Sequence, residues 1–561
     1  MTNQTAKNTF DAIVVGSGIS GGWAAKELTE GGLKTMVLER GRNVEHIIDY
    51  TTALKHPWEF KNRSHLSNKD TAERPIQSSH CDDTNKHFFV KDSEHPYVQI
   101  NPYKWIRGYQ VGGRSLTWGR QCYRFSDLDF EANKKDGHGV DWPIRYDDLA
   151  EWYDYVEDYV GISGRAESLP HLPDGVFLPA IPMNAIELHL QEKVSKEYSD
   201  RVIINGRVAN LTKAKKGRGP CQYRNLCSRG CPFGGYFSSN SSTLLDAQET
   251  GNLTLRANSI VKEVIYDEDQ KKAIGVVIID AITKEETNYY AAIIFLNASA
   301  IATTSILLNS VSPSFPNGLG NSSLQVGHNL MDHVVNEGSY GTYDGLQDKY
   351  YEGKSPGTIY IPRFQNLKEK AQNKDFIRGY GIQGKGEREN WQTVSTSGFG
   401  TSLKEQLAAP GNWKISLGGR GETLPNYENK ITLDTENKDQ WGLPLVKVDF
   451  TYGPNEMAMM EHMTKASEEV LIKAGFKNVG SYRTSPAPGS AVHEMGTARM
   501  GHDPKTSVLN KHNQMHDVKN VFITDGSCMT SSGCQNPSLT YMAITARACQ
   551  FAIKQFQSNQ L

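Results

Sequence analysis

The sequence predicts an α/β protein in which a Rossmann-like nucleotide-binding domain is joined to a second domain built on an antiparallel sheet. One observation is a strand–turn–helix–strand pattern over residues 10–41, with glycines in its turn and an acid at its end. The other is the region from Val334 to about Gly475, which is rich in glycine and alternates polar with apolar or aromatic residues. Buried parallel sheets and half-exposed antiparallel sheets produce these two patterns.

The turn of the first pattern has the spacing of a dinucleotide site. It reads Gly-Ser-Gly-Ile-Ser-Gly directly after an apolar strand. Gly16 allows a tight turn, Gly18 lets the backbone approach a pyrophosphate, and Gly21 lets the helix pack against the strand. Glu39 ends the second strand, about 20 residues later, where a carboxylate can meet a ribose hydroxyl. An ordinary turn between packed elements is the alternative, and the motif alone does not separate FAD from NAD.

Composition bears on the kind of partner. The chain has 561 residues, with 61 Lys and Arg against 63 Asp and Glu and a net charge of −2. This balance indicates neither a nucleic-acid partner nor a membrane-binding surface. The longest apolar run, residues 291–308, is interrupted by Asn, Ser and Thr, so it predicts a buried strand followed by a helix and no membrane span.

The first residues, Met1 to Asn8, are polar and show no export signal. We therefore expect one of three situations. The chain is cytoplasmic, its leader is absent from this sequence, or it reaches the periplasm by co-export with a partner subunit that carries the signal. Eight cysteines in a chain of this length do not predict a disulfide framework.

Glycines between aromatic residues mark a second segment, residues 105–119. The pair Gly112 and Gly113 predicts backbone pressed against a flat ligand, and a glycine turn beside an aromatic core is the alternative. Farther along, helical spacing of apolar residues predicts a helix opened by Asp147 as its N-cap.

Short apolar runs predict strands in both domains. Three are expected in the nucleotide-binding domain, at residues 252–266, 273–280 and 289–296. Three more are expected in the antiparallel sheet, at residues 341–343, 358–361 and 413–417. We assign residues 1–45, 205–333 and 485–561 to the nucleotide-binding domain, and residues 46–204 and 334–484 to the substrate-binding domain and the segments that cover the cofactor.

The C-terminal region holds the residues suited to chemistry. His493 stands just before a glycine turn, and a strand ends at Asp525-Gly526. Asn536 and Pro537 precede a helix, where they suit its cap and first turn. A neutral imidazole takes a proton near neutral pH, and an amide can hold an alcohol oxygen. A core histidine satisfied by backbone is the alternative for His493.

Five blocks in the same order resemble the glucose–methanol–choline (GMC) flavin oxidoreductases over nearly the whole chain. They are GSGISGG with Glu39, GGRSLTWG, VGHNLMDH, HEMGTARMG, and ITDGS followed by CQNPSLTYMA. The resemblance implies FAD, and it implies that His493 and Asn536 are the catalytic pair facing the flavin. It also predicts these cofactor-binding residues: Gly16, Ser17, Gly18, Ile19, Ser20, Gly21, Glu39, Arg40, Gly112, Gly113, Ser115, Thr117, Trp118, Val261, Ala298, Asp525, Gly526, Asn536, Pro537 and Ser538.

One departure from the family bears on the attachment of FAD. Pyranose oxidases of this family tether FAD through the histidine of a Ser-Thr-His-Trp motif. Thr117 stands at the corresponding place in Ser115-Leu116-Thr117-Trp118, so we expect noncovalent FAD.

A loop over residues 221–232 carries three thiols. Cys221, Cys227 and Cys231 have the spacing Cys-x5-Cys-x3-Cys-Pro. Thiolates are the ligands that iron–sulfur clusters require, and sugar dehydrogenases of the GMC family carry a three-iron cluster on a comparable loop. The sequence therefore predicts a [3Fe-4S] cluster. The alternatives are a zinc site lacking its fourth ligand, a disulfide plus a free thiol, or reduced cysteines.

The resemblance is strongest to the sugar dehydrogenase branch, which includes glucoside 3-dehydrogenases. It implies oxidation of a ring secondary alcohol of a sugar or glycoside, with C3 of a glucoside preferred. Electrons would pass to a cytochrome or another external acceptor, and a small partner subunit is expected. The alternatives are a GMC sugar oxidase that uses oxygen, a gluconate or polyol dehydrogenase, an NAD-linked reductase, and a non-enzymatic binding module.

Overall fold

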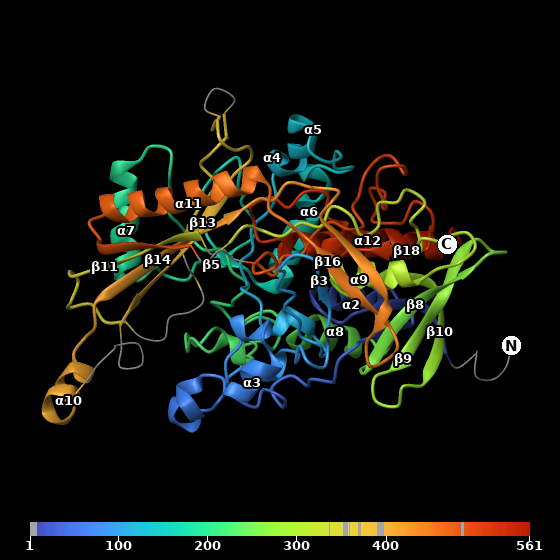
Figure 1. Cartoon of the computed structure of the whole chain (residues 1–561), viewed down its shortest axis with the longest axis horizontal. Helices are drawn as coiled ribbons and strands as arrows, with labels where there is room; N and C mark the ends of the chain where they lie inside the picture. The colour runs from blue at the N-terminus through green and yellow to red at the C-terminus, as the bar shows by residue number, and fades with distance from the viewer. Residues whose placement is uncertain are drawn as a thin grey trace.

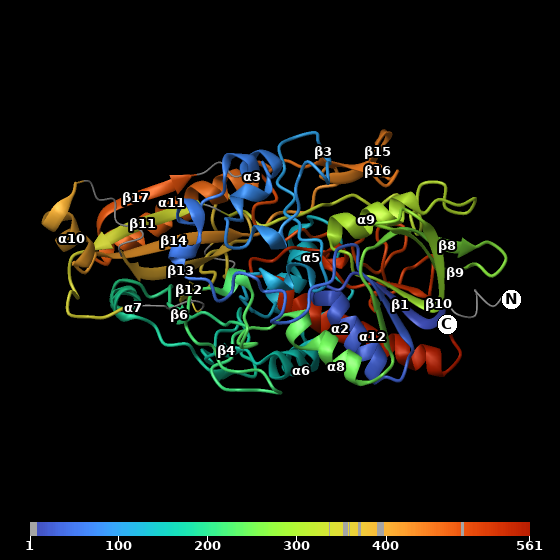
Figure 2. The same ribbon diagram turned by 90° about the horizontal axis from the view of Figure 1, so that it is seen from below.

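The computed structural model describes residues 8–335, 337–351, 357, 359–368, 372–389, 398–483 and 487–561. Two large sheets lie at opposite ends of an elongated molecule, one beneath the labels β8–β10 and the other beneath β11, β13 and β14 (Figure 1). The view turned by 90° shows the same separation (Figure 2). The predicted combination of α/β and antiparallel architecture is confirmed.

The first sheet has seven strands in the order β7-β2-β1-β10-β9-β8, with β18 paired to β10. Strands β7, β2, β1, β10 and β18 run parallel, whereas β9 and β8 are antiparallel. The bounds are β1 Thr9–Val15, β2 Thr35–Leu38, β7 Leu253–Arg256, β8 Ser259–Asp267, β9 Lys272–Asp280, β10 Glu286–Leu296 and β18 Val521–Ile523.

Alternate residues of the central strand β1 serve two cores. Ala12 and Val14 pack with α2 (Ile19–Glu30), α8 (Thr243–Glu249) and α12 (Ser538–Gln557). Ile13 and Val15 join a larger core on the opposite face. Strand side chains alternate between faces, so a strand that is apolar throughout is buried on both sides. Helices α2, α8 and α12 lie side by side in Figure 2.

The second sheet has six antiparallel strands in the order β17-β11-β14-β13-β12-β6. One face packs against α11 (Pro454–Lys473) and α7 (Ala185–Glu197) through Met, Ile, Leu and Val side chains. The bounds are β6 Ile204–Asn205, β11 Glu337–Tyr343, β12 Ile359–Ile361, β13 Tyr380–Arg388, β14 Trp413–Gly421 and β17 Lys477–Arg483. Thr358 of the predicted strand lies outside the described residues.

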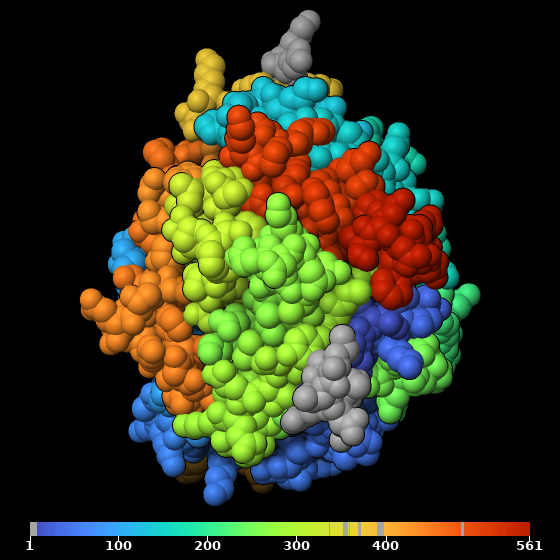
Figure 3. Space-filling view, turned by 90° about the vertical axis from the view of Figure 1, so that its right-hand side faces the viewer, coloured from blue at the N-terminus to red at the C-terminus, as the bar shows by residue number. Residues whose placement is uncertain are grey.

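Smaller elements lie outside the two large sheets. A three-stranded sheet contains β3 Val98–Gln99, β15 Lys430–Lys438 and β16 Pro444–Asp449, and β4 Ser163–Gly164 pairs with β5 Leu178–Pro179. The remaining α-helices are α3 Asn68–Glu73, α4 Asp127–Phe130, α5 Ala132–Asp136, α6 Ala150–Val160, α9 Ala300–Asn309 and α10 Gly400–Ala408. In the end-on space-filling view, the green segment that contains β8–β10 lies at the centre, with the red C-terminal residues beside it (Figure 3).

Three local predictions differ from the structure. Asp147 lies in a 3-10 turn, and α6 begins at Ala150 with Leu149 at its N-cap. The run expected as one strand over 252–266 is two strands, because Asn258 between them has a φ of 55° and turns the chain. Pro537 is the N-cap residue of α12, so the side chain of Asn536 is not used as the cap. The proposed domain boundaries stay predictions.

Within the described residues, no helix is both long and apolar enough to serve as a membrane span.

A buried ion cluster links the second sheet to α5. The guanidinium of Arg378 donates to Glu422 at 2.7 Å and to Asp136 at 2.7 Å. Arg378 and Glu422 are almost inaccessible to solvent. Glu422 also accepts the N–H of Gly533 at 3.3 Å, next to the segment that leads to α12. Removing one partner of a buried pair leaves an uncompensated charge.

We predict that Arg378→Met lowers the free energy of unfolding by about 3–5 kcal/mol, because Glu422 then stays buried without its cation. Urea unfolding followed by circular dichroism measures this change. The control is Lys465→Met, which removes an exposed i,i+4 pair with Glu461 on α11 and should cost about 0.5 kcal/mol or less. Equal effects of the two substitutions would contradict the importance of the buried cluster.

Candidate active site

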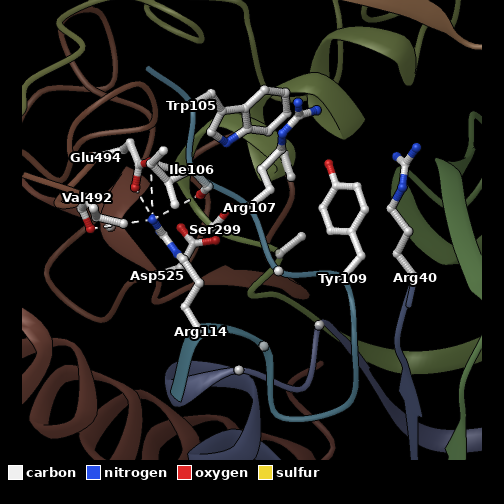
Figure 4. Close-up of a pocket in the computed structure, with 18 of the residues that line it drawn as sticks. Arg40, Trp105, Ile106, Arg107, Tyr109, Arg114, Ser299, Val492, Glu494 and Asp525 are labelled. Atoms are coloured by element: carbon white, nitrogen blue, oxygen red, sulfur yellow. Dashed lines mark hydrogen bonds and ion pairs between the residues drawn. The ribbon is translucent and has the colours of Figure 1, made fainter. Parts of the chain in front are cut away.

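A cavity of about 680 Å³ lies between the two sheets. Its walls come from the β1–α2 turn, from the end of β2 and from the 105–121 segment, while β13 and β14 of the second sheet contribute Gln383 and Arg420. The volume is that of a site for a cofactor or a drug-sized ligand. Figure 4 shows one wall of this cavity, with Arg40, Tyr109 and Arg107 side by side.

Most of the residues predicted to bind cofactor line this cavity. Those that do are Gly16, Ser17, Gly18, Ile19, Ser20, Glu39, Arg40, Gly113, Ser115, Thr117, Trp118, Val261, Ala298, Asp525, Gly526, Asn536 and Ser538. Gly21, Gly112 and Pro537 are not among the lining residues. A cofactor contact by these three residues stays a prediction.

The three motif glycines meet different surroundings. A Cβ on Gly21 would lie 1.8 Å from the carbonyl oxygen of Gly16, so only glycine permits α2 to pack this close to β1. Gly16 has a φ of 94°, and a Cβ there would lie 2.4 Å from the oxygen of Asn297. Gly18 has nothing within 4 Å of such a Cβ, because it borders the cavity at the N-terminus of α2. This open backbone beside free helix N–H groups suits a pyrophosphate.

The carboxylate of Glu39 joins two pieces of the cavity wall. It accepts the hydroxyl of Ser17 at 2.6 Å, the N–H of Ser17 at 3.1 Å and the N–H of Gly41 at 2.9 Å. The hydroxyl of Ser17 in turn accepts the N–H of Gly112 at 2.9 Å. Burial raises the pKa of Glu39, and the hydrogen bonds from Ser17 and Gly41 oppose that rise. A ribose contact by Glu39 stays a prediction.

Several buried polar atoms of the cavity residues have no hydrogen-bond partner. They are the Nδ2 of Asn297, the Oη of Tyr541, and the Nε atoms of Arg40 and Arg107. Buried polar groups in native proteins are almost always satisfied, by protein, water or ligand. Together with the open Gly18, these donors fit the FAD that the sequence predicts.

Sequence reasoning did not single out Arg114 and Glu494. Their side chains form an ion pair of 2.7 Å, and Arg114 also donates to the carbonyls of Ile106 and Val492, as the dashed lines in Figure 4 show. The pair holds the loop before His493 against the 105–119 segment. The only signal in the sequence was that the two residues belong to motifs already noted.

At the end of the cavity that borders the second sheet, His493 and Asn536 come together. The Nε2 of His493 lies 3.5 Å from the Nδ2 of Asn536. The Oδ1 of Asn536 accepts a hydrogen bond of 2.6 Å from the Nε2 of Gln383 on β13. Asn536 thus forms part of a side-chain network rather than a helix cap. Gln383 had no motif to mark it in the sequence.

The imidazole of His493 is neutral at neutral pH. Burial holds its pKa well below the usual 6.5, and the neighbouring His333, Arg420 and Arg114 act in the same direction. Its backbone N–H donates to the buried carboxylate of Asp332 at 3.0 Å. Burial, with a smaller contribution from Glu494, raises the pKa of Asp332 to about 7.

Arg420 brings an unpaired cation to the same end of the cavity. Its guanidinium donates to the carbonyl of Gly419 at 2.9 Å, and none of the carboxylates in the described part of the chain lies within ion-pair distance of it. Burial lowers its pKa. A cation held in this way is available to an anionic or hydroxyl-rich ligand.

The cysteine loop does not form a metal site in this structure. Cys221, Cys227 and Cys231 are free thiols, and two of their sulfurs accept N–H groups from their own loop. Across the described ranges, no group of three or more His, Cys, Asp or Glu side chains is placed to hold a metal ion. The predicted [3Fe-4S] cluster is therefore not supported.

Two sequence models, both described as GMC oxidoreductase, match this chain. One matches residues 10–335 and the other matches residues 425–545. Together they cover most of the sequence.

Curated relatives match almost end to end. The 2-methyl-1,2-propanediol dehydrogenase of Mycolicibacterium austroafricanum is 26% identical over 98% of this chain and 96% of its own. The fructose dehydrogenase large subunit of Gluconobacter japonicus is 25% identical over 98% of each chain. The gluconate 2-dehydrogenase flavoprotein of Pantoea cypripedii is 25% identical over 98% of this chain and 94% of its own.

Among solved structures, a formate oxidase of Aspergillus oryzae RIB40 shares the fold, with a TM-score of 0.63 and 15% identity over 99% of each chain.

A matched pair of glycine substitutions tests the cofactor cavity. Gly21→Ala should lower the free energy of unfolding of the apoprotein by at least about 1–3 kcal/mol, because its Cβ meets backbone. Gly18→Ala should cost the apoprotein at most about 1 kcal/mol, since only the helix cap preference changes. It should nevertheless weaken FAD binding at least about tenfold, or 1.4 kcal/mol, by occupying the open space.

Urea unfolding and titration of FAD fluorescence measure the two effects. Unchanged FAD affinity in Gly18→Ala would contradict the prediction that the pyrophosphate of FAD binds at this turn.

Proposed function

The chain belongs to the GMC oxidoreductase family of FAD-dependent enzymes that act on CH–OH groups, and we propose that it is a sugar or glycoside dehydrogenase. The preferred reaction is oxidation of a ring secondary alcohol, at C3 of a glucoside, to a 3-keto-glycoside. Family membership sets aside the NAD-linked reductase and the non-enzymatic binding module, both of which the glycine motif alone allowed.

The observation that carries the proposal is the composition of the catalytic end of the cavity. A neutral imidazole, two amides and one guanidinium from His493, Asn536, Gln383 and Arg420 converge there. A polyhydroxylated ring offers many donors and acceptors to such a set, and amides and guanidinium groups bind hydroxyl oxygens well. The fructose and gluconate dehydrogenases among the relatives support a sugar-derived substrate.

The chemistry divides between the cofactor and the chain. The β1–α2 turn and the 112–118 loop would hold FAD, which when bound would supply the acceptor for a hydride. His493 takes the hydroxyl proton of the substrate at Nε2, which a neutral imidazole can do at neutral pH. Asn536 donates its amide N–H to the substrate oxygen and orients it. Thr117 lines the cavity and offers no histidyl tether, which supports noncovalent FAD.

Arg420 favours a second candidate, the oxidation of an acidic sugar such as gluconate. Its guanidinium has no carboxylate partner within the described residues, and a bidentate carboxylate is the ligand that guanidinium prefers. The gluconate 2-dehydrogenase flavoprotein among the relatives supports this candidate too. Arg420→Met should then raise the KM for gluconate far more than the KM for a neutral glucoside.

Electrons would leave to an external acceptor, such as a cytochrome. A small partner subunit is proposed because one relative is named as a large subunit. Co-export with such a partner would place the chain in the periplasm. Oxygen as the acceptor is the alternative, and the same preparation tests it, since an oxidase releases hydrogen peroxide in air whereas a dehydrogenase needs an added dye to turn over.

The test is anaerobic flavin reduction by chosen sugars. We expect methyl glucoside and its 2-deoxy analogue to bleach the flavin absorbance, and the 3-deoxy analogue to leave it unchanged because the reacting hydroxyl is missing. Bleaching by gluconate alone would select the second candidate. Persistence of the flavin bands with every sugar would contradict the proposed substrate class.

His493→Ala should retain FAD and lose about 10²–10⁴-fold in the rate of flavin reduction, the usual contribution of a general base. Stopped-flow absorbance measures the rate. His502→Ala is the matched control, because this histidine is exposed and lies outside the cavity. It should reduce flavin within about twofold of the wild-type rate. Equal rates in the two variants would eliminate His493 as the base.

The pH profile follows from the lowered pKa of His493. The neutral, proton-accepting form predominates at every pH above that pKa, so we expect kcat/KM to stay level from pH 8 down to pH 6 and to fall only at lower pH. The pKa of Asp332 is about 7, but among the described residues its carboxylate accepts only backbone N–H groups, which a protonated carboxyl can still accept. A loss of kcat/KM centred at 6.5 would contradict this assignment.

A further inference from the structure

We propose that His333 is a positioning residue that fixes the tautomer of His493, through hydrogen bonds that all run in one direction from Gln383 to two backbone carbonyls. This inference rests on the proposed function, in which His493 accepts the substrate proton. His333 lies in the VGHNLMDH segment and is fully buried. None of the roles assigned above uses it.

The first step concerns the Nε2 of His333. It lies 3.2 Å from the carbonyl oxygen of Ser532 and 2.9 Å from that of Gly533. A carbonyl only accepts, so this nitrogen must carry the hydrogen. Burial lowers the pKa of His333 to about 4. The ring is then neutral at pH 7 and has a single N–H, so its Nδ1 is an acceptor.

The second step passes from one ring to the other. The Nδ1 of His333 lies 2.9 Å from the Nδ1 of His493. Because the former accepts, the latter must donate. His493 is also neutral, so its one hydrogen is on Nδ1 and its Nε2 has a free lone pair directed at Asn536.

The side-chain amides of Asn536 and Gln383 donate hydrogen bonds in the same direction as the two rings. Asn536 presents Nδ2 to the lone pair of His493 at 3.5 Å, and its Oδ1 accepts from Gln383 at 2.6 Å. Amide oxygen and nitrogen differ little in shape, so their orientation is assigned from hydrogen bonds. The carbonyls at the far end require the orientation found here. The chain of donors therefore runs Gln383, Asn536, His493, His333, and ends at Ser532 and Gly533.

Charged groups around the two rings do not provide this control. Arg420 and Arg114 lower the pKa of His493 and so favour its neutral form, but neither donates to nor accepts from its ring among the hydrogen bonds of the described residues. Asp332 bonds the backbone N–H groups of Ala491 and His493, and Glu494 is paired with Arg114. The hydrogen bonds that the described residues make to the rings involve no carboxylate. His333 thus does what a buried carboxylate does in a Ser-His-Asp triad, where it holds the imidazole in the productive tautomer.

The experiment uses the FAD-loaded enzyme labelled with ¹⁵N-histidine. Nitrogen chemical shifts distinguish a protonated from an unprotonated ring nitrogen, and the His493 signals are identified by their absence from His493→Ala. We expect the wild type to show a protonated Nδ1 and an unprotonated Nε2 at His493. An Nε2–H tautomer in the wild type would overturn the proposal, whatever the variants do.

Three variants connect the tautomer to the rate. His333→Leu removes the acceptor, so we expect a tautomer mixture at His493 and flavin reduction slowed about 10²-fold or more, with FAD affinity within twofold of wild type. His333→Asn keeps an acceptor oxygen near the place of Nδ1 and should recover at least tenfold of that loss. His328→Leu, in the same segment, is the control and should keep the wild-type rate.

Two results with the variants would also refute the role of His333. One is a wild-type rate in His333→Leu. The other is a slow His333→Leu in which His493 keeps the Nδ1–H tautomer, because that loss would be structural. Failure of the proposed function is distinguishable, since it would appear as no flavin reduction by any sugar in the wild type while the nitrogen spectrum still reports the tautomer.

Discussion

The structure depends on one close approach, that of α2 to the end of β1. The Cβ position of Gly21 lies almost on the carbonyl of Gly16, so the helix starts where its N–H groups face the cavity. The carboxylate of Glu39 and the hydroxyl of Ser17 then tie this turn to Gly41 and Gly112. Hydrogen bonds to a charged group contribute about 1.5–3 kcal/mol each, and this buried network fixes the turn that forms one wall of the cavity.

The cavity lies between the two sheets, and residues from both sheets are needed to form the proposed reaction site. The first sheet contributes the backbone of the β1–α2 turn and the open space beside Gly18. Strands β13 and β14 of the second sheet contribute the side chains of Gln383 and Arg420 to the same cavity. Asp332 holds the loop that carries His493, and the Arg378 cluster holds the segment before Asn536 through Glu422 and Gly533. The proposed catalytic pair is therefore positioned by contacts from both halves of the molecule.

Electrostatics in this cavity favour a neutral base. Burial works against an imidazolium, and Arg420 and Arg114 add to this, so His493 and His333 are both uncharged at neutral pH. Two neutral imidazoles in contact must divide donor and acceptor roles. The carbonyls of Ser532 and Gly533 decide these roles, because they require the hydrogen of His333 to be on Nε2. Backbone more than 30 residues away in sequence therefore determines which nitrogen of His493 accepts a proton.

The sequence by itself determined those features that depend on the backbone and burial of a single element. Gly16 and Gly21 stand where a side chain would meet backbone, Gly18 leaves open space beside them, and the alternation of β1 follows from burial on both faces. Most of the predicted cofactor residues were found at one cavity for this reason. Asn536 illustrates the limit, because its place before Pro537 suggested a cap, and only the neighbouring sheet shows that its amide is bonded to Gln383 and His493 instead.

Tertiary structure alone decided which distant residues share the site. Gln383 and Arg420 carry no distinguishing local pattern, and the His333–His493 contact joins segments that are far apart in the chain. The cysteine spacing shows the same limit, since spacing along a loop does not specify where three sulfurs point. Side-chain partners depend on packing between separate elements, whereas sequence patterns record what each element requires of its own backbone and burial.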